Sequence, residues 1–118
     1  MEPIKELEGK KIAIIGLGAS QIDYVIGKEN SVEWDEVWVI NSALSVFECD
    51  RVFMLDPVSR FLDTDDAGNQ TNVMRKLLPN FEKPIYTCEL DDRVPALVEY
   101  PLEEVVKDQR CAYMNTTV

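Results

Sequence analysis

The feature that most constrains the fold is a set of short apolar runs that are continuous rather than alternating. A strand with apolar side chains on both faces is typical of a parallel sheet buried between helices. Segments long enough for a helical crossover separate most of these runs, which favours right-handed strand–helix–strand units. The expected strands are residues 11–15, 36–40, 51–55 and 84–88, with weaker candidates at 96–99 and 110–114.

Helices are expected between these runs, at residues 21–26, 42–47, 70–78 and 101–107. Apolar residues spaced three and four apart predict the side of a helix that faces the sheet. Gly27 is expected to end the first helix. The predicted buried stripes are Ile22, Val25 and Ile26 in the first helix, and Val73, Leu77 and Leu78 in the third. The sequence therefore predicts an α/β, Rossmann-like three-layer sandwich, with a mainly parallel sheet of four to five strands and helices on both faces, in one domain spanning residues 1–118.

The charge balance and the absence of histidine exclude several classes of function. Lys and Arg number 12 against 22 Asp and Glu, a net charge of −10, so nucleic acid is not an expected partner. The chain has no histidine, which excludes a Ser-His-Asp or Cys-His catalytic unit and a histidine metal ligand. Cys49, Cys88 and Cys111 form no C-x-x-C pair, so we expect free thiols, no disulfide framework and no metal site.

Nothing in the sequence indicates a membrane or secretory protein. No apolar run approaches the roughly 20 residues that a membrane-spanning helix needs. The first eight residues are charged, and no signal-peptide core follows them. We therefore expect a cytoplasmic location and no membrane partner.

The strongest candidate for a ligand site is the turn after the first expected strand, residues 16–20, which reads Gly-Leu-Gly-Ala-Ser. Glycine lets the backbone approach a ligand closely, and a helix N-terminus offers unpaired amides and a partial positive charge. Together they predict a site for a phosphate or a nucleotide. The alternative interpretation is a tight turn without a ligand. An ordinary NAD site is disfavoured, because Gln21 stands at the third glycine position and Asn41 where an acidic residue would hold the ribose.

Two further polar residues follow the second and third expected strands. Asn41 could bind a base or a sugar, or could be a turn or cap residue. Asp56 could bind a metal or a ribose hydroxyl or serve as a catalytic base, or could simply cap the strand end before Pro57. Residues 63–69 are polar and are expected to form a solvated, mobile loop that could act as a lid.

Three segments resemble a group of bacteriophage Rossmann-like proteins. These segments are residues 12–20 (IAIIGLGAS), 37–41 (VWVIN) and 49–57 (CDRVFMLDP). More distantly, the chain is similar to MptE-like pterin diphosphokinases, motility accessory factors and CMP-sugar sialyltransferases. The resemblance implies a nucleotide pocket and places Asn115, Thr116 and Thr117 in a turn that opens a further helix. The expected binding residues are therefore Gly16, Gly18, Ala19, Ser20, Asn41, Asp56, Asn115, Thr116 and Thr117.

Three functions remain open from the sequence. The first is a nucleotide- or phosphate-binding domain of a phage or prophage protein. The second is a transferase that uses a nucleotide-activated donor, with Asp56 or Asp50 as its base, although the catalytic histidines of the relatives have no counterpart here. The third is a non-catalytic module that docks on a protein partner. Asn115, Thr116 and Thr117 favour the start of a helix, so one interpretation is that the sequence is a C-terminally truncated fragment whose next helix is missing. In that case we expect one face of the sheet to be open or to be covered by another chain, such as a second copy.

Overall fold

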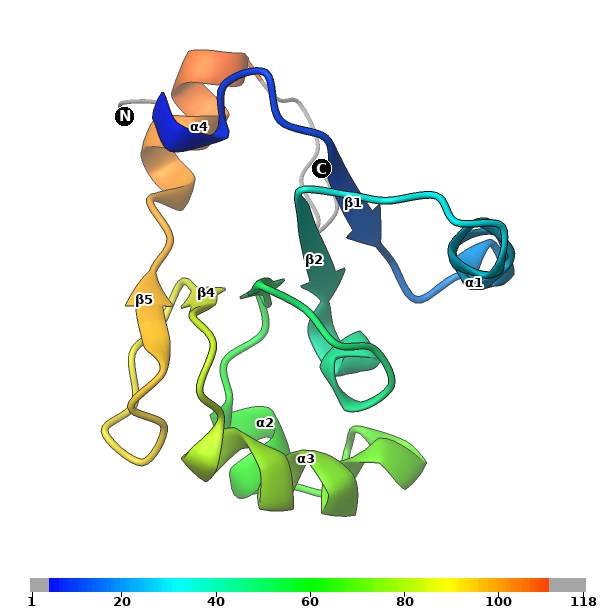
Figure 1. Ribbon diagram of the computed structural model, residues 1–118. Coiled ribbons are helices and arrows are strands. Elements are labelled where there is room, and N and C mark those ends of the chain that lie inside the picture. The colour runs from blue at the N-terminus through cyan, green and yellow to red at the C-terminus, as the bar shows by residue number, and fades with distance from the viewer. Residues whose placement is uncertain (1–4, 111–118) are drawn as a thin grey trace.

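The computed structural model describes residues 5–110, which form a five-stranded, entirely parallel sheet (Figure 1). The strands are β1 Ile12–Ile15, β2 Glu36–Ile40, β3 Arg51–Phe53, β4 Ile85–Thr87 and β5 Leu97–Glu99. The predicted parallel α/β fold is confirmed, and the weak candidate at residues 96–99 is a strand. The strands lie in the order β1-β2-β3-β4-β5, whereas a doubly wound sheet reverses its order at a central crevice. All but the first residue of the candidate strand 110–114 lies outside the described residues.

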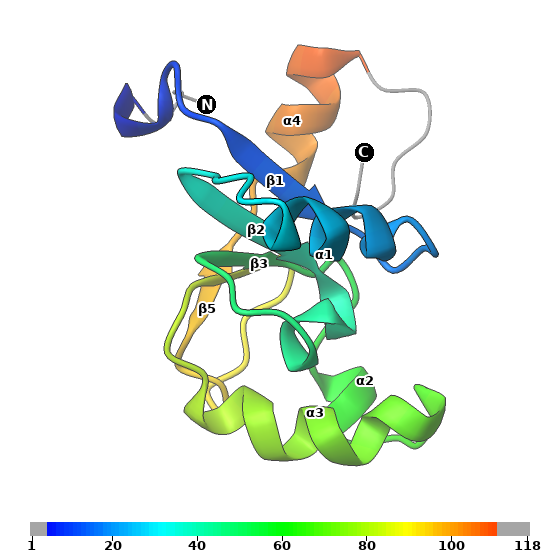
Figure 2. The ribbon, with the colours of Figure 1, turned by 45° about the vertical axis from the view of Figure 1, so that its right-hand side comes forward.

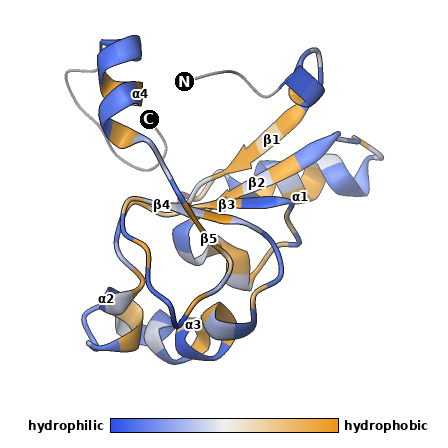
Figure 3. Cartoon of the chain, turned by 90° about the vertical axis from the view of Figure 1, so that its left-hand side faces the viewer, coloured by the Kyte–Doolittle hydropathy of each residue, from blue (hydrophilic) through white to orange (hydrophobic). Residues whose placement is uncertain are grey.

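The helices lie on both sides of the sheet. They are α1 Gln21–Glu29, α2 Ser59–Leu62, α3 Thr71–Leu77 and α4 Leu102–Gln109, with short 3-10 helices η1 Lys5–Leu7, η2 Asn41–Ser45, η3 Gly68–Gln70 and η4 Leu78–Asn80. Side chains of η2, α2 and α3 pack together with the strands in one core. Figures 2 and 3 show α4 on the other side of the sheet from α1.

The core lies on the face of the sheet that η2, α2 and α3 cover. Val39, Val52 and Ile85 come from three neighbouring strands and are fully buried. Met74 and Leu78, on the covering helices, are equally inaccessible to solvent. Burying side chains of this size contributes about 1.5–3 kcal/mol each, so this face supplies most of the stability of the sandwich.

The opposite face of the sheet carries a row of half-buried aromatic rings. The ring of Phe53 packs between Trp38 and Tyr86, with centroids 5.1 and 4.9 Å away. Arg51 lies on the same face, where its Nε donates to Glu36 Oε1 at 2.8 Å and its Nη1 to the Tyr86 hydroxyl at 2.6 Å. The bond from Arg51 holds the pKa of the Glu36 carboxyl below its ordinary value. Apolar residues on both faces account for the continuous runs in the sequence. The expectation that β1 is buried on both faces was wrong in part, because Ile14 is 54% exposed.

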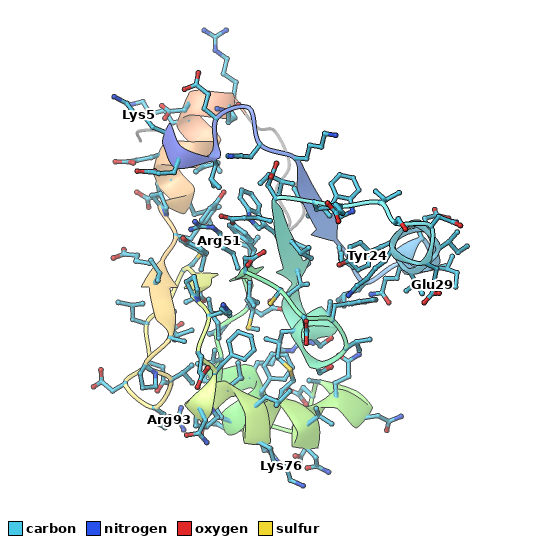
Figure 4. All side chains as sticks on the ribbon, viewed as in Figure 1. Lys5, Tyr24, Glu29, Arg51, Lys76 and Arg93 are labelled. Carbon is cyan, nitrogen blue, oxygen red and sulfur yellow. The ribbon has the colours of Figure 1, made fainter. Side chains whose placement is uncertain are left out.

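The predicted inner stripe of α1 was wrong. Ile22 and Ile26 are 58% and 50% exposed, and Val25 is also exposed. Instead, Tyr24 projects toward β2 and η2 and packs edge-on against Phe47, with ring centroids 5.6 Å apart (Figure 4). A single aromatic ring on the inner side therefore orients the helix, and its aliphatic residues face away from the sheet.

Gly27 does not end α1, which continues to Glu29 and has Asn30 as its C-cap. A Cβ placed on Gly27 would lie 3.6 Å from the Cβ of Val32, so the chain that returns from the helix packs closely over this position. The backbone reverses one residue later than Asn30, at Ser31, which has a φ of 64°. Gly27 is therefore an interior residue of α1, and a Cβ at this position would make an ordinary van der Waals contact with Val32.

The predicted face of α3 was wrong in part. Leu78 is buried as expected, but Val73 and Leu77 are exposed. The residues that enter the core are Thr71, Met74 and Leu78, which recur at spacings of three and four. Two overlapping apolar stripes existed in this sequence, and packing against α2 and η2 selected the one containing Met74.

Candidate functional site

The turn of residues 16–20 connects the end of β1 to the start of α1, as predicted. Register pairs Ile15 with Val39, so Gly16 and Asn41 follow neighbouring parallel strands and lie at the same edge of the sheet. Neighbouring strands are about 4.8 Å apart, which places the backbones of these two residues close together. The structure thus brings two of the predicted binding residues to one edge.

A side chain that the sequence analysis did not assign to the site braces this turn. Gln21 Nε2 donates to the carbonyl oxygen of Gly16 at 2.6 Å. The residue that breaks the dinucleotide fingerprint therefore ties the first turn of α1 back to the end of β1. Only the length of its side chain and its donor group could have indicated this role.

The backbone amides divide into two groups along the turn. Those of Gln21, Ile22 and Asp23 donate to carbonyl oxygens three residues earlier, at 3.2, 3.3 and 2.9 Å. The amides of residues 17–20 donate no hydrogen bond within the described part of the chain. Ser20 is the N-cap residue, but its hydroxyl does not cap the helix. Its backbone is already helical, whereas a capping Ser adopts an extended conformation. Four consecutive amides and an exposed hydroxyl therefore have no hydrogen-bond partner among residues 5–110.

Neither glycine of this turn is explained by the fold itself. Neither Gly16 nor Gly18 has a positive φ, so an L side chain could adopt both conformations. No atom of residues 5–110 lies within 4 Å of a Cβ placed at either position, so packing in this part of the chain does not require glycine. What the two glycines do provide is bare backbone that an outside group can approach closely. Ala19, between them and the helix, is also exposed.

Asn41 has a structural role at this edge. Its φ is 52°, in the left-handed region that Asn tolerates better than most residues. This turn directs Ser42, Ala43 and Leu44 into the protein interior, where all three are buried. The side-chain amide of Asn41 makes no hydrogen bond to another described residue. The turn interpretation therefore holds for its backbone, and its side chain is available for binding.

The two aspartates considered as a catalytic base lie apart. Asp56 follows β3 by three residues, and its Oδ2 accepts a hydrogen bond of 2.8 Å from Arg60 Nη1. Asp50 precedes β3 at the opposite edge of the sheet, and its Oδ2 accepts from the Val37 amide at 2.8 Å. Asp50 is therefore separated from the glycine turn by the length of the strand. Asn115, Thr116, Thr117 and Cys111 lie outside the described residues.

The segment at residues 63–69 is exposed along most of its length, in agreement with the predicted solvated loop, and two arginines bind it. Arg75 donates to the Thr64 carbonyl oxygen and to Asp65 Oδ1, both at 2.8 Å. Arg93 binds Asp63 through both terminal nitrogens, at 2.7 and 2.9 Å, and also binds Asp91. Its guanidinium lowers the pKa of Asp91 to about 2 and also lowers the pKa of Asp63. These acidic residues are therefore committed to ion pairs.

The structure also contains a hollow that the sequence did not predict. It has a volume of about 720 Å³ and lies between α1, η2 and the segments that enter β3 and β4. It is therefore at the amino ends of the strands, on the opposite side from the glycine turn. Its walls come from four separate segments of sequence, so no local pattern could have indicated it. Among residues 5–110, no cluster of three Cys, Asp or Glu side chains could hold a metal ion.

No protein-family model, no curated protein and no solved structure matches this chain. Any functional conclusion must therefore be argued from the residues of the chain itself.

In the described part of the chain, no helix has both the length and the apolar character to cross a bilayer.

Proposed function

We propose that this protein binds a small phosphate-bearing ligand of the nucleotide class at the turn of residues 16–20. The observation that carries the proposal is the pair of open glycines, Gly16 and Gly18, beside four amides without partners among the described residues. Neither the backbone conformation nor the packing of the described residues requires glycine at these two positions. Backbone amides without partners at a helix N-terminus attract anions.

The charge around the turn is mixed. The protein carries a net charge of −10, which opposes anion binding in general. Residues 12–22 contain no acidic side chain, but Asp23 lies in the first turn of α1, where its carboxylate offsets part of the positive charge of the helix N-terminus. The side-chain amide of Asn41, at the next strand end, would contact the base or the sugar.

A titration followed by amide NMR tests this proposal. Inorganic phosphate, and separately a panel of nucleoside monophosphates and diphosphates, should shift the amide resonances of residues 17–20 in a saturable way. Gly18→Ala places a methyl group where the phosphate would approach, and should weaken binding at least about tenfold, or 1.4 kcal/mol. Gly68→Ala makes the same substitution at another open glycine and should leave binding unchanged.

A second substitution separates recognition of phosphate from recognition of the nucleoside. Asn41→Gly keeps the left-handed backbone and removes only the side chain. It should weaken nucleotide binding and leave the affinity for inorganic phosphate unchanged. The proposal is wrong if millimolar phosphate and nucleotides leave the amides of residues 17–20 unshifted, or if Gly18→Ala binds as well as the parent protein.

A further inference from the structure

The hollow at the amino ends of β2, β3 and β4 has a partly apolar wall. Tyr24 from α1 and Phe47 from the segment after η2 meet edge to face there. Phe81, after η4, adds a third ring to the lining, and Val37 and Leu44 lie beside it. Aromatic edges and faces of this kind bind planar apolar groups well. The volume of about 720 Å³ falls within the range of small-molecule sites.

Two lysines that form no ion pair with a described residue lie at this hollow. Four arginines, Arg51, Arg60, Arg75 and Arg93, form ion pairs with carboxylates of the protein itself. Lys28 and Lys83 both line the hollow, and neither forms an ion pair with a described residue. They come from α1 and from the segment before β4, so the fold brings them to one site from distant parts of the sequence.

Two carboxylates also line the hollow, and only one of them accepts a hydrogen bond from a described residue. Asp50 accepts the Val37 amide at 2.8 Å, which fixes its carboxylate against the backbone of β2. Glu48 is exposed and makes no hydrogen bond with another described residue. An incoming anion would therefore be attracted by Lys28 and Lys83 and opposed by both Glu48 and Asp50, of which only Asp50 is held in place by a described hydrogen bond.

We propose that this hollow is a second ligand site, which takes a small molecule with a planar apolar body and one anionic group, such as an aromatic carboxylate or sulfonate. The rings of Tyr24, Phe47 and Phe81 contact the body, and Lys28 and Lys83 bind the anionic group. This site lies at the opposite edge of the sheet from residues 16–20 and does not depend on phosphate binding there.

Two cysteines provide an internal comparison for the test. Cys49 is half-buried and lines the hollow, whereas Cys88 is exposed directly after β4 and does not line it. Burial raises the pKa of both thiols above the ordinary value, so both are predominantly protonated at neutral pH. Cys49 therefore lines the site as a neutral thiol rather than acting as a nucleophile, and its alkylation rate reports occupancy.

The experiment uses anilinonaphthalene sulfonate, a fluorescent probe with an aromatic body and one anionic group, on the intact chain. We expect saturable binding with one equivalent per chain and unchanged near-ultraviolet circular dichroism. Lys28→Gln and Lys83→Gln should each weaken binding about three- to tenfold, and Glu48→Gln should strengthen it. Lys76 projects from α3 away from the sheet, so Lys76→Gln is the matched control and should have no effect (Figure 4).

Iodoacetamide labelling, resolved by peptide mass spectrometry, then locates the bound probe. Saturating probe should slow alkylation of Cys49 at least threefold and leave the rate at Cys88 unchanged. The proposal is overturned by non-saturable binding, by equal protection of both cysteines, or by lysine variants that bind as well as Lys76→Gln. Tighter binding of a cationic aromatic dye than of the sulfonate would also overturn it.

Discussion

Replacement of Gly18 by alanine tests the physical reasoning behind the glycine turn without requiring any ligand. Gly18 has no positive φ, and no atom lies within 4 Å of the position that a Cβ would occupy. Alanine at such a site lowers the conformational entropy of the unfolded chain and introduces no strain into the folded one. Substitutions of this kind stabilise proteins by about 0.4–1 kcal/mol. We therefore expect Gly18→Ala to unfold at a higher urea concentration than the parent protein.

Gly68 provides the matched comparison, because the space around it is equally open but its φ is +66°. Both substitutions change the entropy of the unfolded chain by a similar amount. They differ in the cost of a left-handed alanine, which is about 1–2 kcal/mol. Gly18→Ala should therefore be more stable than Gly68→Ala by about 1–2 kcal/mol.

Urea unfolding followed by tryptophan fluorescence measures this difference, since Trp34 lies just before β2 and Trp38 lies within it. The midpoint should rise for Gly18→Ala and fall for Gly68→Ala, with equal slopes. In a thermal scan, each kcal/mol corresponds to roughly 3–6 °C for a chain of this size. If Gly18→Ala is less stable than the parent, then the fold itself requires glycine there. The argument that an outside ligand explains the glycine would then fail.

Three further predictions concern stability. Met74→Ala removes a fully buried side chain and should cost about 2–5 kcal/mol in urea unfolding; a loss below about 1 kcal/mol would contradict the assigned core. Thr87→Val replaces a buried hydroxyl that has no hydrogen-bond partner among the described residues, and should raise the unfolding free energy by about 1 kcal/mol rather than lower it. Arg93→Gln removes the ion pairs to Asp63 and Asp91. These ion pairs lower the pKa of both carboxyl groups, and they lower that of Asp91 to about 2. Because depressed carboxyl pKa values stabilise the fold above the unfolded value of about 3.9, the parent should have the higher Tm at pH 6, and the two melting curves should converge as the pH falls toward 2; a pH-independent difference would refute the ion-pair explanation.

The sequence by itself predicted most of the strands of this fold and the parallel arrangement of its sheet, but it did not predict α2. Continuous apolar runs are typical of strands between two layers, so the pattern of β1, β2 and β3 favoured a parallel sheet with helical crossovers. The position of Gly16 directly after β1 likewise followed from local sequence, because the same few residues build the strand end and the turn. The net charge of −10 and the absence of histidine, which exclude several classes of function, can also be read from the sequence without the structure.

Only the tertiary structure decided which side of each helix is buried, because that choice depends on the partner rather than on the helix. In α1 the ring of Tyr24 packs against the core, whereas Ile22 is exposed. In α3 the side chain of Met74 is buried, whereas Val73 is exposed. The consecutive strand order and the hollow lined by Lys28 likewise arise from contacts between distant segments. Local periodicity carries no information about such contacts, since they are fixed only when the layers pack together.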